Sequence, residues 1–527
     1  MPFKAYWIWG DEARHLACAQ SFPFNRMYNQ SFFDLHPVFY PYMIRLFSLF
    51  FRDHIAAIAV SFFSSLVLFI TVYRLFLFWN VKRRVIHAAM MYMAFNNVLL
   101  FHSRIPFRYE LFVCLFFLSL YMYLKGISSL KFRYLLLSAL FGGLSFMTFD
   151  MTSFMLIIAL LLAFFVFGFS RRDNLGTQLK KIMPIILIAL IYASCVLLPR
   201  FIIYSTHTYY AGGFGGRIEK VSEFGLKQLI NPVYFPNSSA VWGKLVLRIN
   251  LHLGYIRDRV FQLTELYKHH GVFIDSIVLA FIALPLAIML FKSASAIPVY
   301  FKNRKQATAV FNAHRRDLYL LILILVIFYP LLYAGSLPRY SIASVPFLAY
   351  FFGKGTDILF SVKWIENQLR KKAARYVGIL ILIILVGSIM KKSHHFIFTL
   401  GRIEASDQAG AFLNSLPEDG VLTEGLLADA LVYNCKKRVV ALPRSPDAKT
   451  AREQTDLSTK VFDLHYAVVS EFYKIELATL AYPAVEYIQN TPGKFKLIKT
   501  IYERYNNGTT SNFVRDDDTF YIYEIIR

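Results

Sequence analysis

Long apolar runs separated by short polar connections make up roughly the first 400 residues of the chain. Ten of these runs approach the roughly 20 residues that a helix needs to cross the hydrocarbon core of a bilayer. Their approximate bounds are 54–79, 85–102, 107–124, 132–149, 152–169, 182–204, 272–292, 317–335, 340–353 and 376–391. The pattern therefore predicts a polytopic α-helical membrane protein with about 10 spans.

Composition agrees with this prediction. Hydrophobic residues make up 57% of the chain and charged residues only 17%, whereas about a quarter of an ordinary soluble domain is charged. The net charge of +24 comes from short basic clusters between apolar runs, which is typical of the inner loops of membrane proteins. We therefore expect no nucleic-acid partner.

The basic clusters follow alternate spans, and the positive-inside rule places them in the cytoplasm. They lie at 82–84, 125–133, 171–181, 292–316 and 354–375. The first 52 residues, a long loop at about 205–271 and everything after about 393 are then external. We predict three parts: an external segment over 1–52, a transmembrane domain over 53–392, and an extracytoplasmic domain over 393–527.

The segment from His36 to Phe51 is aromatic and apolar but contains two prolines and Arg45. It is short for a crossing, so we interpret it as an interfacial helix in the headgroup region. A spanning helix here would reverse the sidedness of the first segment, and the basic cluster at 82–84 argues against that alternative.

The last part of the chain has the pattern of a small α/β domain. A polar helix at 406–416 precedes short runs rich in β-branched residues, with helix-like stretches between them. The runs lie at 420–422, 438–442, 466–470, 495–502 and 519–525. No GxGxxG or P-loop is present, so we expect no nucleotide site. The four cysteines have no metal-ligand spacing, so we expect neither a zinc site nor a disulfide framework.

Two charged clusters suggest chemistry. Asp11 and Glu12 stand beside Arg14, just ahead of the apolar runs. Charged groups are costly to hold at a membrane domain, so their presence suggests a function. The alternative is a solvated acidic first turn of a helix. The second cluster contains Arg104, Arg108 and Glu110, and the predicted topology places it on the same external side.

These motifs together resemble the glycosyltransferase C superfamily, in the branch of protein O-mannosyltransferases and lipid A aminoarabinose transferases. The motifs, in order, are GDEAR at 10–14, HPVFYP at 36–41 before an interfacial helix, SRIP at 103–106 with Glu110 at the next helix entrance, and LPRY at 337–340, followed by a terminal external α/β domain. Each motif alone is weak, and their order and common sidedness carry the resemblance.

The resemblance implies a membrane enzyme that moves a sugar from a polyprenyl-phosphate carrier to a hydroxyl or phosphate acceptor on the external face, with inversion. It implies one carboxylate that takes the acceptor's proton and cations that hold the phosphate. The implied catalytic residues are Asp11, Glu12 and Glu110, and the implied phosphate-binding residues are Arg14, His36, Arg104, Arg339 and Tyr340.

The chain departs from the family pattern at two of these positions. Relatives often have lysine where His36 stands, which puts phosphate binding there in doubt because histidine is only partly charged near neutral pH. The second acidic motif is usually Asp, not Glu110. An alternative role for Glu110 is an ion pair with Arg104 or Arg108. Asp150 receives no role.

Two other functions stay open. One is a transporter or flippase of lipid-linked saccharides, which would have charged residues near the midplane of the bilayer and two halves of related structure. The other is a non-catalytic membrane scaffold, which would leave Asp11, Glu12 and Arg14 unexplained. No cofactor is expected, although the carboxylates could bind a divalent cation. The branch implies the bacterial inner membrane. Because only ten residues precede Asp11, we also expect that Met1 is an internal start and that a further helix precedes it.

Overall fold

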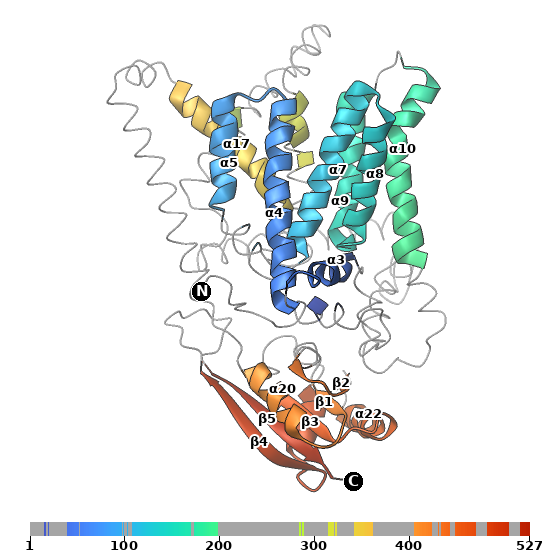
Figure 1. Ribbon diagram of the computed structural model, residues 1–527, viewed down its shortest axis with the longest axis vertical. Helices are drawn as coiled ribbons and strands as arrows, with labels where there is room; N and C mark the ends of the chain where they lie inside the picture. Colours follow the sequence, from blue (N-terminus) through green and yellow to red (C-terminus); the bar gives the residue numbers. More distant parts are fainter. Residues whose placement is uncertain are drawn as a thin grey trace, which may run out of the picture.

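The computed structural model of the protein contains a group of upright helices and a small α/β unit (Figure 1). The structure describes residues 15–16, 19, 39–51, 53–96, 99, 103, 108–169, 173–198, 284–285, 287–288, 315–320, 322–323, 342–361, 405–423, 431, 434–442, 448–470, 482–504 and 517–526.

The helices of the first group follow the predicted apolar runs. In chain order they are α3 (Phe39–Phe47), α4 (Asp53–Phe78), α5 (Arg83–Ala94), α7 (Tyr109–Ser129), α8 (Phe132–Phe146), α9 (Asp150–Ala163) with the π-helical turn η1 (Phe164–Gly168), α10 (Leu175–Tyr192) with the π-helical turn η2 (Ala193–Leu197), and the 3-10 turn η7 (Ile342–Ser344) leading into α17 (Val345–Ser361). Within the described residues, Ile55–Phe78, Tyr109–Ser129 and Leu175–Cys195 are long and apolar enough to cross a membrane.

Two predicted spans differ from the observed helices. The run at 85–102 predicts one helix, but α5 ends at Ala94. The Asn96 side chain accepts a hydrogen bond from the Leu99 amide at 3.3 Å, and asparagine used in this way competes with continued helix. The run at 340–353 is also displaced, because α17 begins at Val345 and continues to Ser361.

Ion pairs explain why α17 continues into a charged stretch that the sequence predicts as a loop. Lys354 bonds Asp317, whose carboxylate also accepts a 2.6 Å hydrogen bond from the Tyr350 hydroxyl. Farther along α17, Asp357 pairs with Lys82 at 2.8 Å. Lys354 and Asp357, both in the second half of α17, therefore each have a partner of opposite sign, which offsets the cost of partly removing them from water.

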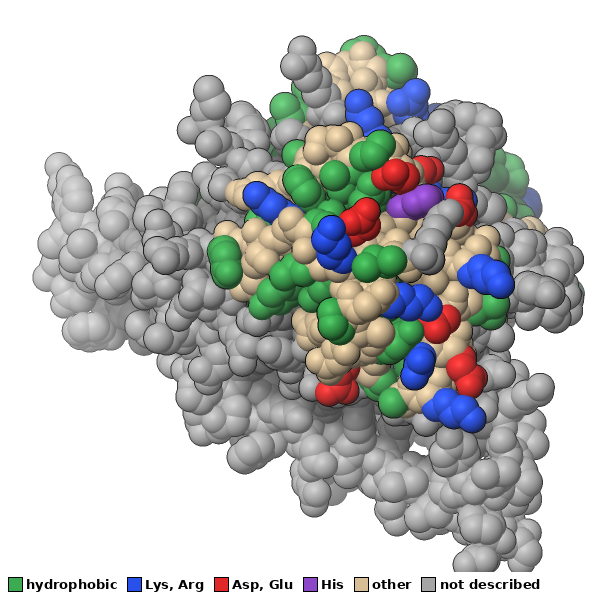
Figure 2. All heavy atoms as spheres, turned by 90° about the horizontal axis from the view of Figure 1, so that it is seen from below, with side chains coloured by type: hydrophobic (Ala, Val, Ile, Leu, Met, Phe, Trp, Pro, Cys, Tyr) green, Lys and Arg blue, Asp and Glu red, His purple; other side chains and the backbone are tan. Residues whose placement is uncertain are grey.

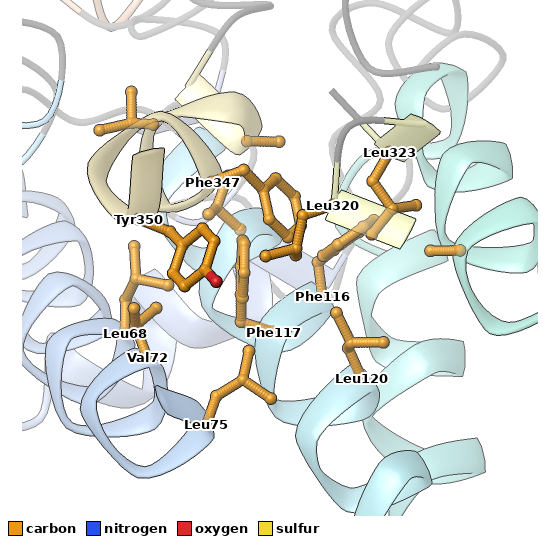
Figure 3. Close-up of a cluster of buried hydrophobic side chains, with 14 of the residues drawn as sticks. Leu68, Val72, Leu75, Phe116, Phe117, Leu120, Leu320, Leu323, Phe347 and Tyr350 are labelled. Atoms are coloured by element: carbon orange, nitrogen blue, oxygen red, sulfur yellow. The ribbon is translucent and has the colours of Figure 1, made fainter. Parts of the chain in front are cut away.

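The centre of the helical group is a large aromatic and aliphatic cluster (Figure 3). It joins α4, α7, α17 and the helical residues 315–320 and 322–323 through side chains that are almost fully buried. Those labelled in Figure 3 are Leu68, Val72, Leu75, Phe116, Phe117, Leu120, Leu320, Leu323, Phe347 and Tyr350. The predicted spans at 272–292, 317–335 and 376–391 lie wholly or mainly outside the described residues, so their number stays a prediction.

Glycines allow several of these helices to approach closely. A Cβ atom at Gly353 of α17 would overlap the backbone carbonyl oxygen of Val85 in α5, and one at Gly142 of α8 would overlap Ile188 of α10. Small residues at helix contacts are characteristic of packing within membranes.

We expect Gly353→Ala to destabilise the protein by about 1–3 kcal/mol, because the carbonyl oxygen of Val85 belongs to the backbone and cannot rotate away. This loss exceeds the roughly 1 kcal/mol gained from better helix propensity. The control is Gly176→Ala in α10, where the nearest atom to an added Cβ is Asn174 Oδ1 at 3.8 Å. Thermal unfolding in detergent measures both. Equal melting temperatures for the two variants would contradict the close α5–α17 contact.

The C-terminal unit is a five-stranded mixed sheet with helices on both faces. Its elements are α20 (Ala405–Ser415), β1 (Val421–Thr423), β2 (Val439–Ala441), α22 (Ala448–Val461), β3 (Tyr466–Ser470), α23 (Tyr482–Gln489), β4 (Phe495–Arg504) and β5 (Asp517–Ile525). The strand order is β2-β1-β3-β5-β4. β1 pairs in parallel with β2 and β3, whereas β5 pairs antiparallel with β3 and β4.

The strands and the polar helix predicted for this unit are all present within a few residues. Strand β3 is central and is buried on both faces: Tyr466 and Val468 pack toward α20, whereas Ala467 and Val469 pack toward α22 and α23. A strand covered on both sides is a continuous apolar run, and the predicted run at 466–470 has the same bounds as β3.

The face of the molecule seen from below carries charges of both signs among its described residues (Figure 2). Lys and Arg alternate there with Asp and Glu, and apolar side chains lie between them. A nucleic-acid-binding surface would be a patch or stripe of basic residues. The described part of this face does not have that character.

Candidate active site

Among the predicted site residues, the structure describes Glu110. The others lie outside the described residues; they are Asp11, Glu12, Arg14, His36, Arg104, Arg339 and Tyr340. The site is therefore built from Glu110 outward, through the described residues around the start of α7.

Glu110 lies in the first turn of α7, two positions after the N-cap residue Arg108. An acidic residue in this position interacts favourably with the helix dipole. The side chain is nevertheless fully buried, and neither carboxylate oxygen has a hydrogen-bond partner among the described residues. A buried polar group without a partner costs stability, so the fold alone does not explain why Glu110 is there.

The described structure does not contain the ion pair between Glu110 and Arg108 that the sequence allows. Arg108 is 2% exposed, and its Nε and Nη1 atoms also lack hydrogen-bond partners in the described part of the chain. Residues two positions apart on a helix do not face each other, which keeps these neighbours from pairing. The proposed alternative partner Arg104 lies outside the described residues.

Aromatic rings surround the Arg108 guanidinium. Its Cζ atom lies 4.5 Å from the centroid of the Phe149 ring and 5.8 Å from that of Tyr109. Phe149 precedes α9, and its ring meets those of Tyr109 and Phe112 edge-on at 5.0 and 5.7 Å. The start of α7 and the junction between α8 and α9 therefore form one aromatic wall.

The described residues that follow the GDEAR motif pack beside this wall. Leu16 and Ala19 are buried in one cluster with Ile44 of α3, Ala57 of α4 and Leu111 of α7. Leu16 follows Arg14 by two positions, and Leu111 directly follows Glu110. Two segments far apart in the sequence, each next to a predicted catalytic motif, thus meet in one hydrophobic cluster.

Helix α3 holds this cluster against the neighbouring helices. The Phe39 amide donates a 3.0 Å hydrogen bond to the Met147 carbonyl at the end of α8. The ring of Tyr40 meets His15 edge-on at 5.1 Å. In Figure 1, α3 lies across the lower end of the upright helices. The predicted helix after His36 is therefore present, and its place at a membrane interface stays a prediction.

From the sequence, Arg108 is placed in the second charged cluster and named as a potential partner of Glu110 but not as a substrate ligand. His15, Tyr40 and Phe149 are not selected. The available signals are modest: Arg108 interrupts an aromatic run, and His15 directly follows Arg14. In the described part of the chain, no group of three or more His, Cys, Asp or Glu residues is arranged to hold a metal ion.

The chain is similar to a known protein family and to solved structures. The family model described as dolichyl-phosphate-mannose-protein mannosyltransferase matches residues 35–198, which include α3 to α10 and hence Glu110. No curated protein sequence matches the chain.

Two solved structures are similar over almost the whole chain. The crystal structure of ArnT from Cupriavidus metallidurans in the apo state has a TM-score of 0.52 and 13% sequence identity, and the match covers 99% of this chain and 95% of that one. The structure of the same protein bound to undecaprenyl phosphate has a TM-score of 0.51 and 12% identity with equal coverage.

The overall fold is thus that of the ArnT structures, and described helices are long and apolar enough to cross a membrane. The family model over residues 35–198 supports glycosyltransferase activity in general. Together these comparisons confirm the predicted resemblance to the branch of the glycosyltransferase C superfamily that holds the mannosyltransferases and aminoarabinose transferases.

Proposed function

We propose that the protein transfers a sugar from a polyprenyl-phosphate carrier to a hydroxyl or phosphate of a protein, lipid or glycan acceptor, with inversion, on the external face of the membrane. The observation that carries the proposal is the buried carboxylate of Glu110, which has no hydrogen-bond partner among the described residues. The structure of ArnT with undecaprenyl phosphate supports a carrier of this class.

The proposed reaction is a single displacement. The acceptor oxygen bonds to the anomeric carbon, the bond from that carbon to the phosphate oxygen breaks, and the phosphate leaves with the electron pair. The acceptor's proton passes to a carboxylate, for which we propose Asp11 with Glu12 and Glu110 nearby. Cationic and polar side chains stabilise the leaving phosphate; we propose Arg14, His36, Arg104, Arg339 and Tyr340.

We also propose how the chain is divided into parts and where it is located. Residues 1–52 supply the catalytic segment and the interfacial helix, residues 53–392 form the transmembrane domain, and residues 393–527 form an extracytoplasmic domain. The proposed location is the bacterial inner membrane. The reaction as written needs no metal, and a chelator added to the assay tests whether the carboxylates use a divalent cation.

A transfer assay tests the proposed function. Purified full-length protein in lipid nanodiscs is incubated with a panel of radiolabelled polyprenyl-phosphate sugars and with lipid, peptide and glycan acceptors. We expect labelled glycoside and free polyprenyl phosphate from at least one donor. A flippase would instead move labelled donor across proteoliposomes without forming a glycoside, and a scaffold would do neither. Either outcome would refute the proposal.

We expect Glu110→Gln to lower the transfer rate by at least about tenfold, because the amide cannot accept a proton as a carboxylate does. The folded protein should not lose stability, since Glu110 makes no hydrogen bond in the described part of the chain. The control is Asp456→Asn, which removes a carboxylate paired with Lys494 in the C-terminal unit. Unchanged transfer by Glu110→Gln, with thermal unfolding as the folding check, would exclude a role for this carboxylate.

A further inference from the structure

Arg108 has no role in the reaction proposed above, yet its position is costly. Its side chain is 2% exposed, and Nε and Nη1 are fully buried without a hydrogen-bond partner in the described structure. Burial of a charge requires a partner of opposite charge or hydrogen bonds that replace water. Neither Glu110 nor any other described carboxylate supplies one.

Lys181, another buried cation of the described helices, has partners. Its ammonium donates 2.7 Å hydrogen bonds to the Gly168 carbonyl and to the Asp173 carboxylate. Even Arg316, which is partly exposed, donates a 2.8 Å hydrogen bond to the carbonyl of Trp79. Arg108 differs from both.

The aromatic wall accounts for the orientation of Arg108 but not for its charge. The Cζ atom lies over the Phe149 ring, 4.5 Å from its centroid, and such a cation–π contact is attractive. The ring carries no oxygen or nitrogen acceptor, so it does not satisfy the N–H donors of the guanidinium. The contact thus holds the group in place, and its buried donors still need an acceptor.

We propose that Arg108 binds an anionic oxygen of a substrate, in a phosphate or a carboxylate. This inference rests on the proposed function and adds a residue to it. A guanidinium has donors only, and a neutral acceptor would leave its charge uncompensated in a buried place. Glu110 lies two residues further along α7 and also lacks a described hydrogen-bond partner. This end of α7 is therefore suited to a ligand that carries both an anion and a hydroxyl.

Two sources of the anion are distinguishable: the phosphate of the carrier, and an anionic group on the sugar or the acceptor. The variants are Arg108→Met, which keeps the length and apolar contacts, and Arg108→Lys, which keeps the charge but not the planar fork. The matched control is Arg133→Met, because Arg133 also lies over an aromatic ring, that of Tyr134 at 4.9 Å, but is exposed.

The first measurement is the thermal unfolding of the full-length protein with increasing undecaprenyl phosphate. If the carrier supplies the anion, Arg108→Met should weaken its apparent affinity about 10- to 100-fold, Arg108→Lys should recover part of it, and Arg133→Met should match the wild type. Without ligand, Arg108→Met should melt no lower than the wild type, because the variant removes a buried charge without a described partner.

The second measurement is the KM for acceptors with and without a carboxylate or phosphate group, and for donors with neutral and anionic sugars. If Arg108→Met leaves the affinity for the carrier unchanged and raises the KM only for the anionic substrates, the anion that Arg108 binds belongs to the sugar or the acceptor. Unchanged carrier affinity and unchanged KM in both Arg108 variants overturn the inference, whatever their melting temperatures. The proposed function fails separately, by the absence of any transfer in the wild type.

Discussion

Asp11→Asn should lower the rate of sugar transfer by about 10²–10⁴-fold, the effect typical of a lost general base. The amide keeps the shape of the side chain and its ability to accept a hydrogen bond but cannot take the acceptor's proton. Donor binding should change much less than the rate constant. The measurement is steady-state transfer of labelled sugar in nanodiscs, with kcat and KM determined separately for the donor and the acceptor.

Glu12→Gln is the matched control, because it makes the same chemical change one residue away and should have a smaller effect. Described contacts place the chain just beyond these residues against α7, since Leu16 shares a buried cluster with Leu111. If Asp11→Asn retained near-normal transfer while Glu12→Gln lost it, the base would be assigned to the wrong carboxylate. Near-normal transfer by both variants would exclude this motif from catalysis.

Arg14→Ala and Arg339→Ala should each weaken donor binding by about 10- to 100-fold, because hydrogen bonds between arginine and phosphate are charge-assisted. Acceptor KM should change little. Arg14→Lys and Arg339→Lys should restore only part of the affinity, since an ammonium lacks the planar fork that matches phosphate oxygens. Isothermal titration with polyprenyl phosphate measures the effect without requiring turnover.

A useful control for these variants is Arg316→Ala. Arg316 lies on the described helical segment 315–320 and donates a hydrogen bond to the carbonyl of Trp79, at the end of α4 far from α3. It should lower stability without lowering the intrinsic donor affinity. If donor affinity fell equally in all three alanine variants, loss of the native fold and not loss of a phosphate contact would explain the result.

The sequence predicts the helices well where a long apolar run ends in a polar cluster. The run at 54–79 becomes α4 at Asp53–Phe78 because nothing inside it competes with the helix. Prediction fails where a side chain acts on its own backbone or at long range. The Asn96 side chain bonds a nearby amide where α5 ends, and α17 is extended by Asp317, which lies far away in the sequence.

The same limit applies to the candidate site. The position of Glu110 at the entrance of α7 follows from the local pattern, because an acidic residue directly precedes an apolar run. Its burial depends on residues from other helices, and so does the stacking of Arg108 on Phe149. Neither has a local signature. Charged neighbours on a helix invite the prediction of an ion pair, and only the three-dimensional arrangement shows that these two side chains are separate.

Helix α17 links the chain near the proposed site to a set of ion pairs. It follows η7 at Ile342–Ser344, a few residues after the proposed phosphate ligand Arg339, and from its middle onward it is held by Asp317, Lys82 and the contact of Gly353 with Val85. A helix of this length is a stiff rod of about 25 Å. The ion pairs therefore fix the orientation of α17. Weakening them would tilt the helix and displace its N-terminal end. Substitutions at Asp317 or Asp357 should then alter catalysis at a distance, without any contact with the substrate.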